Sequence, residues 1–523
     1  MGLRIFLKNL NEKIMVQLSN KVIAKNTLLL FVRTLLIMGI SLYTSRVVLS
    51  VLGVEDYGIY NVVGGIVSML AFLNSAMVQA SQRYLSFTQG MDDIIYQKKI
   101  FSTTIHIHIT IAVIVVILLE TIGLWYVNNN VVLPSNRLYA ANVVYQISIL
   151  IFLSRIIVVP YTASVIAHEK MEVYAYISIL DYVIQLGFVF LLKVVSFDKL
   201  ILYSTLMLIV AYINFLLFFV YSKRKFPECI FQWKKDWSMY KEMFGFSSWA
   251  FCGGAGFVAR NQGVNLIINI FCGPAVNAAR GVAFQVSAAI QTLISSFQQS
   301  MNPQIVKRYA VGDKESMLFL VRAGSKYSFL LLLICFLPIL VRPNYVLSLW
   351  LGKAPEFADG FLVMAIIMTL INSMGGTLDT AMQATGNIKL FQIVVSIIML
   401  LDLPLAYCLL LFDIEPYMVT SVSIFTSLFC LFAKILLLHR LIDFNLSHFF
   451  VSVVLRNAIV AVIMLGLFVE ISQVIPMTFW GLVLLCILSL LLNGVVIYII
   501  GLESSERKIM IDMIQMIIIK VTR

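Results

Sequence analysis

Long apolar runs alternate with short polar connections along almost the whole chain. Most of these runs reach roughly 20 residues, the length that a helix needs to cross the hydrocarbon core of a bilayer. A membrane β-barrel would instead show short segments in which polar and apolar residues alternate. The runs predict an all-α, polytopic membrane protein with about 14 transmembrane helices, at residues 26–50, 58–82, 101–126, 140–166, 174–196, 200–221, 246–271, 275–301, 327–350, 359–383, 390–412, 417–438, 451–471 and 478–501.

Composition excludes a soluble fold. Hydrophobic residues make up 61% of the 523 residues and charged residues 12%, whereas soluble domains carry about 25% charged residues. The net charge of +12 would suggest nucleic acid as a partner of a soluble protein, but here the charge lies almost entirely in the connections between apolar runs. Membrane lipids, and no nucleic acid, are therefore the expected surroundings.

The basic residues also predict the orientation. If the N-terminus is cytoplasmic, the connections on that side carry Lys and Arg in an excess of about four to one, which is the bias expected of cytoplasmic loops. The opposite side holds few basic residues: Arg46, Arg137, Lys199, Arg342 and Lys353. Both termini are therefore predicted to be cytoplasmic.

A weak internal repeat divides the chain into two halves. The landmarks of residues 51–58, with Arg83-Tyr84 and Gly90 after them, recur about 220 residues later in residues 270–277, Arg308-Tyr309 and Gly312. Such a repeat predicts two parallel six-helix bundles related by an axis along the membrane normal. The predicted organisation is an interfacial amphipathic helix (1–25), an N-terminal bundle (26–222), a basic cytoplasmic linker (223–245), a C-terminal bundle (246–440), helices thirteen and fourteen (441–502) and an amphipathic cytoplasmic tail (503–523).

Polar side chains recur at spacings of three and four on the first two predicted helices of each half. On a helix this spacing places them on one face, as in the lining of a transport path. The same pattern also arises where helices hydrogen-bond to each other, so both interpretations stay open. The residues proposed to line a cavity are Asn61, Asn261, Asn265, Gln291 and Gln298.

Arginines lie within or beside the same helices. A charge at the centre of a span costs at least about 2.5 kcal/mol by insertion scales, so each needs a partner, water or a function. Arg33, Arg260 and Arg280 have no obvious carboxylate on their own helices. Together they would give a cavity a positive field suited to an anionic head group. Snorkelling or pairing is the alternative for Arg280 and Arg46.

The acidic residues in spans suggest two different roles. Arg155 and Asp181 fall at similar depths on adjacent antiparallel helices and are predicted to form a structural ion pair. Asp379 and Asp402 have no partner visible in the sequence. Either is a candidate to bind a proton or a sodium ion, with helix packing as the alternative.

No catalytic, nucleotide or metal motif is present in the sequence. His106 and His108 point to different faces of a helix, and the seven cysteines lack the spacing of a metal or redox site. Gly253, Gly254 and Gly256 have no phosphate-loop context and predict close helix packing or a bend. The chain is therefore not expected to be an enzyme or to carry a cofactor.

Several segments resemble the bacterial polysaccharide and O-antigen flippases of the multidrug/oligosaccharidyl-lipid/polysaccharide (MOP) exporter superfamily. They are Asn26 to Arg33, Ser41-Leu-Tyr-Thr-Ser-Arg46, Leu52-Gly-Val-Glu-Asp-Tyr-Gly-Ile-Tyr-Asn61, Arg83-Tyr-Leu-Ser-Phe87 and Asn277-Ala-Ala-Arg-Gly281. The resemblance implies two six-helix bundles around a central cavity, in the bacterial inner membrane. It implies a lipid-linked oligosaccharide substrate, undecaprenyl-diphosphate-linked and moved to the periplasmic leaflet, with Arg33 and Arg260 on the diphosphate, and other polysaccharide assembly proteins as partners.

Two other classes of function stay open. One is an ion-coupled multidrug efflux antiporter of the same superfamily, although that branch has an acidic residue in its first helix, where this chain has Arg33 and no acid. The other is a membrane-embedded polysaccharide polymerase or ligase, which is disfavoured because the chain lacks a long outer loop with catalytic arginines.

The predicted orientation leads to a labelling experiment. Single cysteines placed at Asn129 and Asn344 should react with membrane-impermeant thiol reagents added from outside, and a cysteine at Ser316 should not, because the basic connections hold the latter on the cytoplasmic side. The exposed native cysteines would first be replaced by serine. The reverse labelling pattern would contradict the predicted topology.

Overall fold

The computed structural model describes most of the chain. The described residues are 25–41, 43–44, 47–48, 50–53, 56, 59–60, 63–64, 66–67, 71–91, 93–129, 135–195, 197–233, 236–352, 354–412, 414–442, 445–503 and 506–507. Asn61, residues 1–24 of the predicted surface helix, and nearly all of the predicted tail at 503–523 lie outside them.

The described part of the chain is helical and contains no strand, so the all-α prediction is confirmed. Helical residues 25–41 come first. The later elements are α2 (Ala71–Met91), α3 (Ile94–Leu118), η1 (Leu119–Gly123), α4 (Leu124–Asn129), η2 (Ser135–Arg137), α5 (Leu138–Ala167), α6 (Met171–Leu191), α7 (Lys199–Lys225), α8 (Trp237–Ala310), α9 (Lys314–Val341), α10 (Pro343–Leu351), α11 (Ala358–Ser373), α12 (Gly376–Thr385), α13 (Lys389–Leu400), α14 (Asp402–Leu410), η3 (Pro416–Met418), α15 (Val419–Ile442), α16 (Leu446–Phe449), η4 (Phe450–Leu455), α17 (Arg456–Val474), α18 (Phe479–Val496) and η5 (Ile497–Gly501).

The helices agree with the predicted spans. Among the described residues, 10 helical segments are long and apolar enough to cross a membrane, and each overlaps one predicted span. The 74-residue helix α8 bends at Gly273, where φ is 80°. Glycine adopts this left-handed conformation without a side-chain clash. The bend falls between the predicted spans 246–271 and 275–301, so α8 supplies two helical arms where two spans are predicted.

The predicted span 327–350 has the wrong boundary. The apolar run at 327–350 crosses a break, because α9 ends at Val341 and α10 begins at Pro343. Proline has no N–H to donate and is favoured at the first position of a helix. The buried Arg342 at the break donates hydrogen bonds to the carbonyl oxygens of Ser472 and Pro476, at 2.7 and 2.8 Å, at the end of α17. Arg342 thus satisfies carbonyls that a helix end leaves unpaired.

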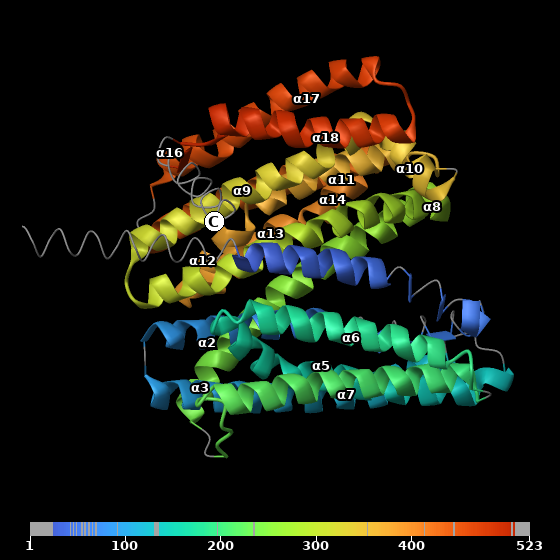
Figure 1. Ribbon diagram of the computed structural model, residues 1–523, viewed down its shortest axis with the longest axis vertical. Coiled ribbons are helices and arrows are strands. Elements are labelled where there is room, and N and C mark those ends of the chain that lie inside the picture. Colours follow the sequence, from blue (N-terminus) through green and yellow to red (C-terminus); the bar gives the residue numbers. More distant parts are fainter. Residues whose placement is uncertain are drawn as a thin grey trace, which may run out of the picture. The chain divides into compact units, whose positions relative to one another are not determined.

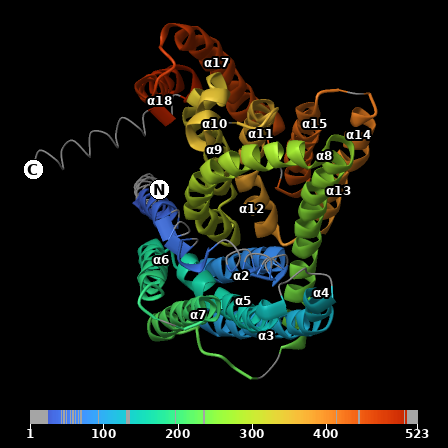
Figure 2. The same cartoon turned by 90° about the vertical axis from the view of Figure 1, so that its right-hand side faces the viewer.

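Two compact units make up the chain (Figures 1 and 2). In unit 1, α5 packs against α2, α3, α6 and α7. In unit 2, α9 packs against α11, α12, α17 and α18, and α11 packs against α15. Unit 1 comprises Met1–Ala255, Gln299–Asp313 and Gly386–Gln392, and unit 2 comprises Gly256–Gln298, Lys314–Thr385 and Ile393–Arg523. The domain boundaries expected from the sequence repeat stay a prediction.

Close approaches fix the helices of each unit. In unit 1, the fully buried Tyr145 donates a hydrogen bond of 2.6 Å to the carbonyl of Leu119, at the start of the π-helical turn η1. Such turns weaken the regular backbone bonding, so a side-chain donor is stabilising there. A side chain at Gly253 would collide with Gln392, and one at Gly256 would press on Ser396. The close packing predicted at these two glycines is therefore confirmed.

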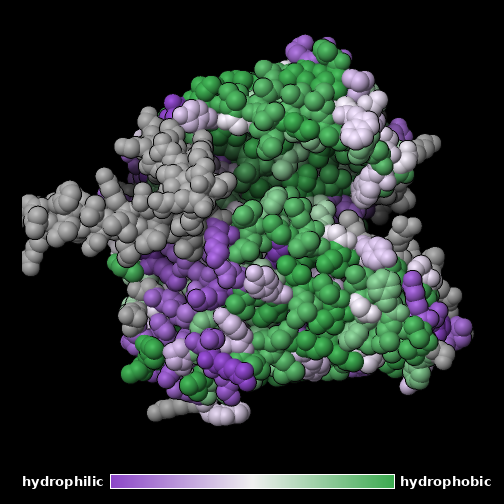
Figure 3. All heavy atoms as spheres, viewed as in Figure 1, coloured by the Kyte–Doolittle hydropathy of each residue, from purple (hydrophilic) through white to green (hydrophobic). Residues whose placement is uncertain are grey.

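Many large apolar side chains lie on the outside of the helices. Phe412, Val462 and Leu490 are 75%, 72% and 62% exposed. Figure 3 shows apolar residues covering the middle of the helical faces on the visible side, with hydrophilic residues gathered toward the helix ends. Soluble monomers rarely expose apolar area on this scale. The exposed faces are those of helices solvated by lipid.

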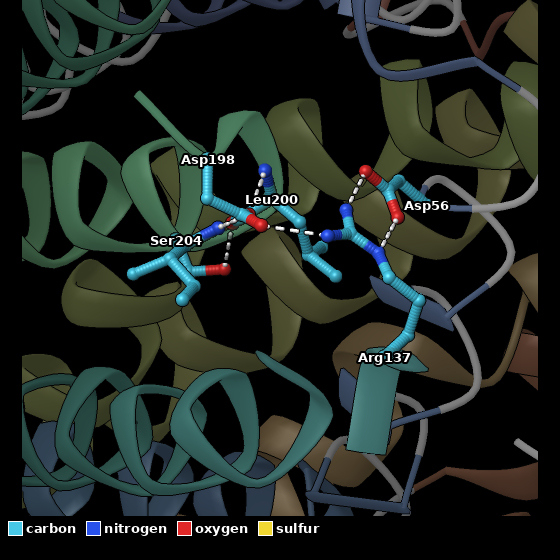
Figure 4. A network of polar contacts seen from close by, with 6 residues as sticks. Asp56, Arg137, Asp198, Leu200 and Ser204 are labelled. Atoms are coloured by element: carbon cyan, nitrogen blue, oxygen red, sulfur yellow. Dashed lines mark hydrogen bonds and ion pairs between the residues drawn. The ribbon is translucent and has the colours of Figure 1, made fainter. Parts of the chain in front are cut away.

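A charged network ties three connections of unit 1 together (Figure 4). Arg137 donates to both carboxylate oxygens of Asp56 and, at 2.6 Å, to Asp198. Asp198 caps α7 by accepting from the backbone N–H groups of Leu200 and Ile201, each at 3.1 Å. Burial acts to raise the pKa of Asp198, but the hydrogen bonds from Ile201 and Arg137 outweigh burial and hold that pKa below its usual value.

This network should stabilise the fold above acidic pH. Because the pKa of Asp198 is lowered in the folded state, its contribution is present above the ordinary aspartate pKa of about 4 and is lost as the pH falls through the folded value. Arg137→Ala should lower the free energy of unfolding at pH 7 by about 1 to 3 kcal/mol, the range for charged hydrogen bonds. Thermal unfolding of the full chain in detergent, from pH 7 downward, measures both effects.

The matched control is Arg224→Ala, which removes an exposed arginine from the last turn of α7. It should change the melting temperature little. Equal melting temperatures and equal acid sensitivity of the two variants would contradict a stabilising role for Arg137.

Candidate functional site

Unit 1 contains a cavity of about 510 Å³ among its helices. Its wall comes from the first helix, α2, α5, α6, α7 and the last part of α8. The polar lining residues are Arg33, Gln82, Ser154, Arg155, Thr162, Ser178, Asp181, Gln185, Asn214 and Gln299, and the tyrosines are Tyr60, Tyr174, Tyr182 and Tyr203. A concave pocket of this size, on which many polar groups converge, can hold a small ligand or a head group.

Helix α6 brings its polar groups to the cavity through its spacing. Ser178, Asp181 and Gln185 follow one another at intervals of three and four residues, which places them on one face of the helix. Gln185 donates a hydrogen bond of 3.1 Å to Asp181. On the opposite face of α6, the side chains of Tyr176, Leu180 and Val183 are exposed.

The predicted ion pair of Arg155 with Asp181 is not formed. Both side chains line the cavity, but within the described residues no carboxylate lies within 4.0 Å of the guanidinium of Arg155. The depth argument was right in placing the two residues on one wall, but equal depth does not fix the rotation of each helix. The two charges therefore face a shared space instead of neutralising each other in contact.

Arg33 enters the same cavity from the first helix. Its guanidinium carbon lies 4.6 Å from the centre of the Tyr174 ring, in cation–π geometry. Its Nε is buried and donates no hydrogen bond to any residue that the structure describes. With Arg155 and Asp181, it gives the cavity wall two basic side chains and one acidic side chain. The substrate role of Arg33 stays a prediction.

In unit 2, Arg260 and Asp402 form a buried ion pair. They are 4% and 0% exposed, and Nε of Arg260 donates to the carboxylate of Asp402. Ser423 donates to the same carboxylate at 2.7 Å, and Thr426 donates to its other oxygen. The sequence shows no partner for Asp402, and the structure pairs it with Arg260. The role of Asp402 in ion coupling stays a prediction. The ion pair with Asp402 gives Arg260 a structural role. The substrate role of Arg260 stays a prediction.

Asp379 also has a partner that the sequence does not reveal. Nζ of Lys434 lies 2.8 Å from its carboxylate. The lysine comes from α15 and the aspartate from α12, so helix packing brings the two together. The role of Asp379 in ion coupling stays a prediction.

The other predicted cavity residues of unit 2 belong to α8. Arg280 is buried, donates to the side chain of Asn265, and lies 4.2 Å from the Phe284 ring centre. Gln298 donates at 3.0 Å to Ser328 and to the carbonyl of Ser373, which is the hydrogen-bonding seam that was the alternative to a cavity. Asn261 is half-buried. Gln291 keeps a buried carbonyl oxygen without a hydrogen bond.

Sequence reasoning missed much of the unit 1 wall. Gln185 and Asn214 are polar residues in strongly apolar runs, and that contrast was a usable signal. Tyr174 gave no signal, since tyrosine is ordinary at the end of a membrane helix. In the part of the chain that the structure describes, no three His, Cys, Asp or Glu side chains converge as metal ligands.

The buried pair of unit 2 leads to a stability experiment. Arg260→Ala should lower the free energy of unfolding by about 3 to 5 kcal/mol, because it leaves the carboxylate of Asp402 buried and unpaired. Arg260→Met combined with Asp402→Leu should recover much of that loss, since both charges are removed. Melting temperature and expression level measure the effect. A stable Arg260→Ala protein that has lost transport would instead assign Arg260 to the substrate.

Known proteins with a similar sequence segment or a similar fold are membrane transporters. Residues 258–408 match the family model described as MatE. No curated protein matches the chain. The chain is similar to the outward-facing structure of a multidrug resistance MATE family transporter of the MOP superfamily, with a TM-score of 0.69 and 11% identity over 80% of this chain and 96% of that one.

Two further structures are similar to the same degree. A MATE protein in complex with MaD3S has a TM-score of 0.68 and 11% identity over 82% of this chain and 97% of that one. A MOP superfamily transporter from Pyrococcus furiosus Vc1, described as having a binding pocket of reverse polarity, has a TM-score of 0.67 and 12% identity over 81% of this chain and 96% of that one. The chain has the fold of these MATE transporter structures, and residues 258–408 are similar to the MatE family.

Proposed function

We propose that the chain is a membrane transporter of the MOP superfamily, which moves an amphipathic substrate across the bilayer by alternating access. Support comes from the fold, the MatE match and the 10 apolar helices of the described residues. The superfamily consists of transporters, so no enzymatic reaction is proposed. The proposed location is the bacterial inner membrane, with both termini in the cytoplasm.

The cavity of unit 1 favours a substrate with an anionic head group. Its wall holds Arg33 and Arg155 against the single acid Asp181, and neither arginine is in an ion pair within the described residues. This charge balance is the observation that carries the proposal. Guanidinium groups offer a planar fork of donors that matches phosphate oxygens, so a phosphate or diphosphate ester is the favoured head group.

The substrate proposed on this basis is an undecaprenyl-diphosphate-linked oligosaccharide, flipped from the cytoplasmic to the periplasmic leaflet for surface polysaccharide assembly. Its lipid tail suits the exposed apolar helices, and its sugars suit the amide and tyrosine groups of the cavity wall. Other assembly proteins of the same pathway are the proposed partners.

Multidrug efflux is the second candidate, and the similar structures by themselves favour it, because those structures include a multidrug resistance transporter. Within the chain, the acid Asp181 in the cavity is the feature that a cationic drug would need. The Pyrococcus transporter is relevant to the choice between an anionic and a cationic substrate, since the reverse polarity of its binding pocket suggests a different function for that protein. Pocket charge is therefore a reasonable property by which to separate the two candidates.

Ion coupling is proposed for Asp379 in preference to Asp402. Asp379 is half-buried and holds one cation partner, Lys434, so that protonation would release a single contact. Asp402 is fully buried and accepts from Arg260, Ser423 and Thr426. Proton uptake there would leave a buried arginine unpaired, at a high cost in stability.

A binding experiment separates the two substrates. The full chain in detergent would be titrated with undecaprenyl diphosphate and, separately, with the lipophilic cation ethidium. Arg33→Ala and Arg155→Ala should each weaken binding of the diphosphate lipid by about tenfold to hundredfold, since a hydrogen bond to a charged group contributes about 1.5 to 3 kcal/mol. Arg33→Lys and Arg155→Lys should bind the diphosphate lipid with an affinity between those of the wild type and the alanine variants, because lysine keeps the charge but not the planar fork of donors.

The control is Arg224→Ala, which removes an equal charge from outside the cavity. Binding of ethidium that is lost in Asp181→Asn, together with no binding of the diphosphate lipid by the wild type, would reject the anionic substrate and select multidrug efflux.

A further inference from the structure

The side chain of Tyr174 holds Arg33 in place without using any of its hydrogen-bond donors. The guanidinium carbon of Arg33 lies 4.6 Å from the centre of the tyrosine ring, within the roughly 6 Å over which a cation–π contact is attractive. Such a contact is made through the face of the ring and the face of the guanidinium. The N–H groups at the guanidinium edge therefore stay available.

The arrangement differs from that of the buried Arg260 and Arg280 of unit 2. Arg260 donates hydrogen bonds to the carboxylate of Asp402 and to the carbonyl of Ser423, and Arg280 donates to the side chain of Asn265. For Arg33, by contrast, Nε is buried without a hydrogen bond, and no carboxylate among the described residues lies within ion-pair distance. A buried donor that lacks a partner carries a desolvation penalty, which a ligand acceptor would relieve.

The ring of Tyr174 is itself held rigidly. It packs against a small buried cluster of Leu30, Ile166 and Met171, which are 0%, 3% and 0% exposed. The Phe218 ring of α7 lies 6.3 Å from it, centre to centre. The ring is thus fixed by side chains of the first helix, α5, α6 and α7.

Leu30 and Arg33, which lie beside the ring of Tyr174, are on one face of the first helix. Leu30 and Arg33 are three residues apart, so they lie one above the other along the helix. Leu30 is buried in the cluster beside the ring, and Arg33 reaches over the ring into the cavity. The apolar contact at Leu30 fixes the rotation of the helix, and that rotation aims Arg33.

We infer that Tyr174 is a positioning residue for substrate binding, which fixes the guanidinium of Arg33 in the cavity with its donors free for a phosphate group. The inference rests on the proposed anionic substrate. It adds a residue that does not touch the phosphate but determines how tightly Arg33 can grip it. A guanidinium that is already held in position loses less side-chain freedom when it binds a phosphate. Tyr174 therefore strengthens phosphate binding although it does not touch the phosphate.

The aromatic face is the essential feature, and that makes the inference testable. Tyr174→Phe keeps the ring and should bind inorganic pyrophosphate like the wild type. Tyr174→Leu keeps apolar volume but removes the ring, and it should weaken binding by about threefold to thirtyfold, which corresponds to the range of cation–π energies. Isothermal titration of the full chain in detergent with pyrophosphate gives the dissociation constants.

Two further measurements separate positioning from general stability. Val144→Ala removes methyl groups from a fully buried residue of the unit 1 core that does not line the cavity, so it should lower the melting temperature without changing pyrophosphate affinity. In an Arg33→Ala background, Tyr174→Leu should cause no additional loss, because the two residues act through one contact. In transport assays, Tyr174→Leu should raise KM with little change in the maximal rate.

The outcomes are distinguishable. No binding of pyrophosphate by the wild type would reject the anionic substrate proposed above, and the inference with it. Binding by the wild type with equal affinity of a folded Tyr174→Leu protein would reject the positioning role alone. Additive losses from Arg33→Ala and Tyr174→Leu would likewise show that the tyrosine acts independently of Arg33.

Discussion

A charge enclosed by apolar helices must find an opposite charge or a full set of hydrogen bonds, and this requirement organises the polar residues of the chain. The clearest case is Asp402, which is 0% exposed and accepts from Arg260, Ser423 and Thr426. Lys326 and Glu506 form a second pair, 2% and 7% exposed, that joins α9 to the segment after η5. Each pair couples helices far apart in the sequence, because separating them would leave an uncompensated buried charge.

The cavity of unit 1 departs from this pattern. Arg33, Arg155 and Asp181 face one space, and within the described residues none of the three is held in an ion pair. Polar groups in such a space need water or a ligand to complete their hydrogen bonds. Charges that are fully paired are best explained by structure, and charges that are left open are best explained by binding. On this basis, unit 1 contains the stronger candidate site.

The same reasoning connects the cavity to the choice of substrate. Two arginines against one aspartate favour an anion, and the planar donors of Arg33, kept free by the face of Tyr174, favour a phosphate ester. The fold by itself does not select a substrate, because one architecture can serve different ligands according to the residues in its site. Pocket polarity therefore carries more information about function than the similarity of the helices.

The sequence by itself determined the class of the protein and the approximate position of nearly every helix. Apolar runs of sufficient length have one solution in a bilayer, since every backbone group must bond within its own helix. The boundary predicted from hydropathy is wrong at Pro343, because the apolar run continues there although the helix breaks. The sequence also identified which polar residues required an explanation, among them Arg33, Arg260, Asp379 and Asp402.

Only the tertiary structure decided which of those residues meet. Arg260 and Asp402 are 142 positions apart, and sequence spacing reveals neighbours only within one helix, three or four residues away. Arg155 and Asp181 lie at equal depth but not in contact, since the rotation of each helix about its axis is set by packing against all its neighbours. Tyr174 became a candidate only when the first helix was placed against α6, because a contact between a ring face and a cation depends on orientation, which the order of residues does not record.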